Sequence, residues 1–249
     1  MGACITLEAS PQGSKRRGSL RKSGTSAAIN EKIKLALRTS IEEQKAEAHP
    51  MTLERILLKF DKLQDVLGYV KDVFTGMAAG AEGLGPIDLE KALKSLKGSS
   101  SPEEVKEIFD FSDLEQTRLV DLKEFVVALT VSIALEKVNF GTEKVQLAPS
   151  PRRQSISSFF GHPREVYSML RLIISAYLLF DPEGKGFINK DQVGEMLKES
   201  GSRGDNSMLS NERWAELDWD KDGTIDLAEF INAFTHWVDT DNVLEFDDE

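Results

Sequence analysis

The stretch D-W-D-K-D-G-T-I-D-L-A-E, residues 218–229, decides how the rest of this 249-residue chain is interpreted. Residues able to supply oxygen ligands stand at positions 1, 3, 5, 7, 9 and 12 of the stretch, namely Asp218, Asp220, Asp222, Thr224, Asp226 and Glu229. Calcium takes about six to eight oxygen ligands, and a 12-residue loop supplies them from these positions around a sharp glycine turn at position 6. Gly223 occupies that turn position. The segment predicts one strong Ca²⁺ site, which Mg²⁺ can also fill at rest.

A second copy of this skeleton, loop three at residues 181–192, has lost charge at two ligand positions. It keeps Asp181, Glu183 and Asn189, but Lys185 places an ammonium at the third ligand position and Gln192 replaces the bidentate carboxylate. Because the ligand charge count sets the affinity of such loops, we expect weak calcium binding or none.

Loop two, residues 113–124, has the opposite defect. Its acids survive at positions 1, 3, 9 and 12 as Asp113, Glu115, Asp121 and Glu124, but Arg118 stands where the glycine belongs. A side chain forced to a positive φ costs about 1–2 kcal/mol, and its cation competes with the metal. This site is also predicted to be weak or lost.

Loop one, aligned at residues 80–91 with Ile87 at position 8, has one acid among its first five residues and Lys91 at position 12. We expect no calcium binding there. Ile87 is predicted to pair with Val120 of loop two.

Helical apolar periodicity flanks the loops, and the whole arrangement resembles the EF-hand superfamily. The four-fold layout over residues 56–237 is similar to calmodulin and the calmodulin-like sensors, and the long N-terminal tail resembles that of some plant and algal calmodulin-like proteins. The resemblance implies an all-α fold of two lobes, each made of two helix-loop-helix hands whose loops are joined by short β-bridges. Because paired hands bury each other's apolar faces, a hand without ligands can persist as packing support.

Composition and periodicity set the predicted boundaries. Ile29, Ile33, Leu37 and Ile41 are spaced four apart, which indicates an amphipathic helix, and residues 138–162 are Ser/Pro-rich and aperiodic. We therefore predict a disordered basic tail at 1–26, an amphipathic helix at 27–50, a lobe of degenerate hands at 51–137, a linker at 138–162, a lobe carrying the strong loop at 163–238 and an acidic tail at 239–249.

The first residues, M-G-A-C-I-T, match the N-myristoylation pattern at Gly2, and Cys4 is placed for palmitoylation. Lys and Arg residues follow between positions 15 and 22. A second acyl chain or a polybasic patch makes membrane attachment stable. Ser19 and Ser155 each follow an Arg-Arg pair and are candidate phosphorylation sites; phosphate at Ser19 would weaken the basic patch.

The net charge of −11 is unevenly spread, because the first 40 residues are basic and the rest is acidic. An acidic body argues against a nucleic-acid partner, while the basic head suits an anionic membrane surface. Cys4, the single cysteine, fits a reducing compartment, and no apolar run approaches the ~18–20 residues that span a bilayer. We expect the cytoplasmic face of a membrane, with the plasma membrane as the best candidate and exchange with the cytosol.

No catalytic constellation is visible, so we predict a non-enzyme. The expected function is a membrane-tethered calcium sensor that exposes an apolar groove for the amphipathic helix of a target protein. The expected groove-lining residues are Trp214, Phe230, Phe234, Leu172 and Leu178. Three alternatives remain open. The first is a calcium-insensitive EF-hand adaptor, and the second is a regulatory subunit of a kinase or phosphatase, of which the chain's own N-terminal helix in the groove would be the sign. The third is a calcium buffer, which is the least favoured because one strong loop in 249 residues gives little capacity.

Overall fold

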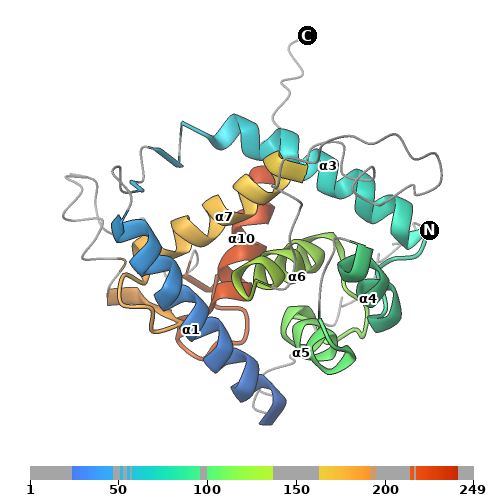
Figure 1. The fold of residues 1–249 in the computed structure, drawn as a ribbon, viewed down its shortest axis with the longest axis horizontal. Helices are drawn as coiled ribbons and strands as arrows, with labels where there is room; N and C mark the ends of the chain where they lie inside the picture. The colour runs from blue at the N-terminus through green and yellow to red at the C-terminus, as the bar shows by residue number, and fades with distance from the viewer. Residues whose placement is uncertain are drawn as a thin grey trace, which may run out of the picture.

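The computed structural model describes residues 24–46, 51–52, 55–56, 58–95, 100–136, 163–191, 193, 214–215 and 217–240. Within them the all-α prediction is confirmed (Figure 1). The elements are α1 (Gly24–Ala46), α3 (Phe60–Ala78), α4 (Pro86–Ser95), α5 (Pro102–Ser112), α6 (Leu122–Ala134), α7 (Pro163–Phe180), β1 (Ile188–Asn189), β2 (Thr224–Ile225) and α10 (Leu227–Thr240).

Reciprocal capping fixes where the helices begin. At α5, the Ser101 hydroxyl accepts from the Glu104 amide at 3.3 Å while the Glu104 carboxylate accepts from the Ser101 amide at 2.9 Å, which makes a capping box. At α6, Asp121 and Glu124 form the same box at 2.8 and 3.0 Å. A loop acid at position 9 therefore also starts the helix that leaves the loop.

Short antiparallel contacts join the loops in pairs. In β1 and β2, Ile188 of loop three pairs with Ile225 of loop four. In the first half an isolated bridge joins Leu84 to Val120. The two pairs of hands follow the pairing that the EF-hand resemblance implies.

The predicted pairing of Ile87 with Val120 is wrong. Ile87 is 67% exposed, whereas Leu84 is 1% exposed and exchanges two backbone hydrogen bonds with Val120, both 2.9 Å long. Leu84 lies six residues after the end of α3, whereas Val120 lies eight residues after the end of α5, so loop one is two residues shorter. Gly83 permits this approach, because a Cβ there would lie 2.8 Å from the Val120 carbonyl oxygen.

One continuous core unites both pairs of hands. Helix α6, central in Figure 1, is buried from Glu124 to Ala134 and packs against α10, α7 and α5. The apolar core extends from Ile29 in α1 to Ala233 in α10. The two pairs thus stabilise each other, while the predicted linker at 138–162 lies outside the described residues.

Helix α1 confirms the predicted amphipathic helix and adds a contact that the sequence did not indicate. It lies across α5, α6 and α7 (Figure 1) and buries Ile29, Ile33 and Leu37 in the common core. In the described part of the chain, no helix has the length and apolar character that crossing a membrane requires.

Candidate metal centre

Loop four gathers three carboxylates around one point. Oxygen atoms of Asp218, Asp220 and Asp222 all lie within 4.8 Å of one another. Asp218 is 6% exposed; its Oδ2 accepts from the Gly223 amide at 3.1 Å, but its Oδ1 is buried with no hydrogen-bond partner among the described residues. Leaving a buried carboxylate oxygen unpaired is costly. A hard cation held by the three acids would satisfy it.

Glu229 lies at the base of the same loop and is 3% exposed. Its Oε1 accepts from the amides of Trp219 and Asp220 at 2.9 and 3.2 Å, and its Oε2 accepts from the Asp226 amide at 3.0 Å. Asp226 caps α10 in return through the Glu229 amide at 2.9 Å. Both predicted ligands are therefore positioned by the start of α10.

Burial raises the pKa of Glu229 to about 8, and the neighbouring Asp226 charge adds to the effect. A bound cation would favour the ionised form instead. Glu229 therefore ionises more readily when a cation is bound in the loop than when none is bound.

Gly223 forms the sharp turn of loop four in a conformation that favours glycine. Gly223 has φ +89°, and a Cβ placed there would meet no atom of the described residues within 4 Å. Asp222 Oδ1 accepts from the Thr224 amide at 2.9 Å and from its hydroxyl at 2.7 Å, while the Asp222 amide donates to Asp220 Oδ1 at 3.1 Å. These residues fit the donor set expected for calcium.

The acids of loop two accept hydrogen bonds from backbone amides of the same loop. Asp113 accepts from the amides of Thr117 and Arg118 at 2.9 and 3.0 Å, so both of its oxygens have partners. Glu124 is 2% exposed and accepts from the Glu115 and Asp121 amides at 3.0 Å each. Burial raises the pKa of Glu124 to about 7. The predicted positive φ of Arg118 is confirmed at +65°.

In loop three, too, the acids at positions 1 and 3 have partners within the loop. Asp181 is 0% exposed and accepts from the Lys185 and Gly186 amides at 2.9 and 2.7 Å. The Lys185 ammonium forms an ion pair with Glu183 at 2.8 Å, which neutralises a second candidate ligand. Asn189 lies in β1 opposite Thr224, and Gln192 lies outside the described residues.

The bridge at Leu84 also corrects the ligand positions of loop one. Glu124 and Glu229 lie four residues after their bridging residues, so Asp88, and not Lys91, takes the position-12 place. Asp88 is exposed and forms an ion pair with Lys91 at 2.8 Å. No cluster of three potential ligand side chains forms there among the described residues.

Sequence reasoning missed Tyr177, whose hydroxyl is buried without a hydrogen-bond partner among the described residues. Burial, reinforced by the charges of Asp181, Asp226 and Glu229, raises its pKa far above the usual range. Its ring meets Phe230 edge-on with centroids 5.4 Å apart. Tyr177 therefore lies between the acids of loops three and four and the aromatic side chains of α10. The sequence signal for this role is its position near the end of the apolar helix α7.

The residues expected to line a groove are mostly core in this structure. Trp214, Phe230, Leu172 and Leu178 are all less than 10% exposed, and Phe234 is partly buried. Gly2, Cys4, Ser19 and Ser155 lie outside the described residues.

Comparison with known proteins places this geometry in a family. The chain is 30% identical over 194 residues to the probable calcium-binding protein CML22 of Arabidopsis thaliana, covering 77% of this chain and 80% of that protein. It is 24% identical over 187 residues to the probable calcium-binding protein CML21 of the same plant, with 75% of each covered. It is also 28% identical over 167 residues to the ventricular/cardiac isoform of rat myosin regulatory light chain 2, covering 61% of this chain and 98% of that protein. No family model matches the chain. On its loop spacing, its paired hands and these relatives, the chain belongs to the calmodulin-like proteins of the EF-hand superfamily.

Proposed function

We propose that this protein is a non-enzymatic calcium sensor with a single strong site in loop four. The observation that carries the proposal is the buried Oδ1 of Asp218, which lies within a three-carboxylate cluster and has no hydrogen-bond partner in the part of the chain that the structure describes. Asp218, Asp220, Asp222, Asp226, the Thr224 carbonyl and both oxygens of Glu229 would hold the ion. The names of the two plant relatives, both probable calcium-binding proteins, support the same conclusion.

The fold offers a route from this site to the apolar core. Glu229 stands in the first turn of α10, and Phe230, the next residue, lies in an aromatic cluster with Tyr177, Phe180 and Phe234. A change in the hydrogen bonds of Glu229 on calcium binding would therefore alter the packing of α10. We expect this change to open the buried apolar surface to an amphipathic target helix.

Calcium titration calorimetry tests the site, with a fluorescent apolar dye followed in parallel. The wild-type protein is expected to bind one ion and to increase dye fluorescence. Glu229→Gln should abolish both responses, while Glu124→Gln, the matched change in loop two, should leave the stoichiometry unchanged. Calcium binding without a rise in dye fluorescence would favour the calcium-insensitive adaptor, and absence of calcium binding would refute the sensor.

Membrane tethering through Gly2, Cys4 and the basic head belongs to the same proposal. It is supported by the sequence of the first 22 residues. Acylated protein should sediment with anionic liposomes, whereas Gly2→Ala protein should not. Equal sedimentation of the two would contradict a lipid anchor, and unchanged binding by Ser19→Glu would contradict a phosphate switch.

One observation favours the second candidate, a regulatory subunit of a kinase or phosphatase. The chain's own N-terminal helix α1 is docked on the body of the molecule. Recovery of a stable complex with such an enzyme in the absence of calcium would select this alternative over a free sensor.

A further inference from the structure

Helix α1 packs on the paired hands, here called the body, but takes no part in the pairing of their loops. Both loop bridges, Leu84 with Val120 and Ile188 with Ile225, lie outside α1. Within the described residues, α1 contributes three fully buried apolar side chains, Ile29, Ile33 and Leu37, to a core of more than forty. This attachment is small enough to be exchanged for an equivalent one.

Three polar contacts along α1 fix the direction in which the helix lies on the body; the surface that they mark is called the footprint of α1. Lys32 forms an ion pair with Glu107 of α5 at 2.6 Å, and the Arg38 guanidinium donates to the Gly184 carbonyl of loop three at 3.2 Å. Farther along, Glu43 accepts from Arg171 of α7 at 2.8 Å. The body therefore presents an acid at one end of the footprint, a carbonyl in the middle and a cation at the other end.

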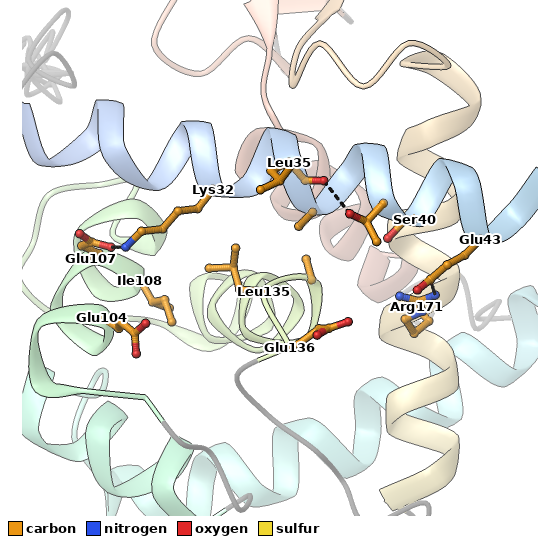
Figure 2. A pocket seen from close by; sticks show the side chains of 13 residues that line it. Lys32, Leu35, Ser40, Glu43, Glu104, Glu107, Ile108, Leu135, Glu136 and Arg171 are labelled. Carbon is orange, nitrogen blue, oxygen red and sulfur yellow. Dashed lines mark hydrogen bonds and ion pairs between the residues drawn. The ribbon is translucent and has the colours of Figure 1, made fainter.

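Among the described residues, a pocket open to solvent lies beside α1. A cavity of about 350 Å³ lies between α1, α5, the end of α6 and α7, with Ile108 and Leu135 among its lining residues (Figure 2). Leu35 reaches its edge but is 67% exposed. A helix with a larger apolar side chain facing the cavity would fit this surface better than α1 does.

We propose that the face under α1 is a binding site for an amphipathic helix of a partner protein, and that α1 occupies it here as an internal ligand. The fitting helix carries apolar residues at i, i+4 and i+8, a cation at i+3 for Glu107, a second cation at i+9 for the Gly184 carbonyl and an acid at i+14 for Arg171. This spacing is that of Ile29, Ile33, Leu37, Lys32, Arg38 and Glu43. The site is separate from loop four and does not depend on calcium binding there.

A fluorescein-labelled peptide of residues 24–46 is the probe, titrated by fluorescence anisotropy into the full chain with a calcium chelator present. Leu37→Ala weakens the chain's own α1, and Leu35→Ala on the exposed face of the same helix is the matched control. The Leu37→Ala chain should bind the peptide at least tenfold more tightly than either the wild-type or the Leu35→Ala chain does. A Lys32→Glu peptide should bind that chain less tightly, and adding Glu107→Lys to the chain should restore the affinity.

Absence of peptide binding by a Leu37→Ala chain that keeps native helicity would overturn the proposal, because α1 would then be a fixed part of the core. If Leu37→Ala does not fold, Ile29→Ala near the start of the helix takes its place, and failure of both to fold would have the same meaning. Concentration-dependent dimers without peptide binding would assign the face to a second copy of this chain and likewise overturn the proposal.

Discussion

At the scale of single residues, the aspartate at position 1 of the loop has different hydrogen-bond partners in different loops. Asp113, Asp181 and Asp218 all occupy position 1, but the first two have both oxygens satisfied by loop amides. In loop four the amide of Asp222 donates to Asp220 instead, which leaves Asp218 Oδ1 without a partner among the described residues. Acids at both positions 3 and 5 thus distinguish the loop that fits a cation from those that have replaced it with internal hydrogen bonds.

The pKa of Glu229, which burial raises to about 8 from its ordinary value of 4.5, predicts a pH-dependent calcium affinity. The folded metal-free state holds the proton more tightly than the unfolded state, so its stabilising contribution is present below about pH 4.5 and is lost as the pH rises through about 8. Calcium must displace that proton. Between about pH 6 and about pH 8 the affinity should rise by up to about tenfold per pH unit, with proton release. Calorimetry in buffers of different ionisation enthalpy measures both; a pH-independent affinity without proton release would contradict the prediction.

Arg118 predicts a stabilising substitution. Its φ of +65° is strained for a residue with a Cβ, so Arg118→Gly should raise the free energy of unfolding by about 1 kcal/mol and the melting temperature by about 2–4 °C. Arg118→Ala removes the charge but keeps the Cβ and should gain less. Equal thermal shifts for the two variants would assign the effect to the charge and not to the backbone.

At the scale of elements, the helices and three of the four loops follow from the sequence, whereas the place of α1 does not. The four-residue spacing of Ile29, Ile33 and Leu37 predicts an apolar stripe but carries no information about which surface receives it. The predicted register of loop one was wrong for a related reason. Leu84 and Ile87 are both apolar, and the shorter loop determines that Leu84 is the one that pairs with Val120. Apolar periodicity identifies which face of a helix is buried, but which element covers that face depends on how all the helices pack together.

The contact between α1 and loop three predicts unequal costs for two glycine substitutions. Gly184 has φ +64°, and a Cβ there would lie 2.7 Å from Arg38 Cγ, whereas Gly223, with φ +89°, has nothing within 4 Å. Both Gly184→Ala and Gly223→Ala cost about 1–2 kcal/mol of backbone strain, and the first adds an overpacking cost of about 1–3 kcal/mol. Thermal unfolding in a calcium chelator should therefore show the larger loss for Gly184→Ala, with partial recovery on adding Arg38→Ala. Equal losses would show that α1 does not press on loop three in solution.

At the scale of the whole molecule, α6 makes the two pairs of hands one structural unit. It is buried along its length and contacts helices from both halves of the chain. The division of the sequence at 138–162 gives no sign of this, because a long aperiodic segment is compatible with both separate and packed pairs. The nearly continuous apolar run from Phe125 to Ala134 is the signal that could have indicated a helix covered on every side.

This shared core predicts one cooperative unfolding transition that calcium shifts as a whole. The three tryptophans all belong to the second half of the chain: Trp219 in loop four, Trp214 just before it and Trp237 in α10. Their fluorescence therefore reports the second pair of hands, while circular dichroism reports all helices. The two signals should change together, and calcium at about 100 times its dissociation constant should add about 2.7 kcal/mol, or about 5–10 °C. Glu229→Gln should keep the single transition but lose the shift. Two separate transitions, of which calcium moves only the one seen by tryptophan, would instead mean that the pairs of hands unfold independently and that α6 does not couple them.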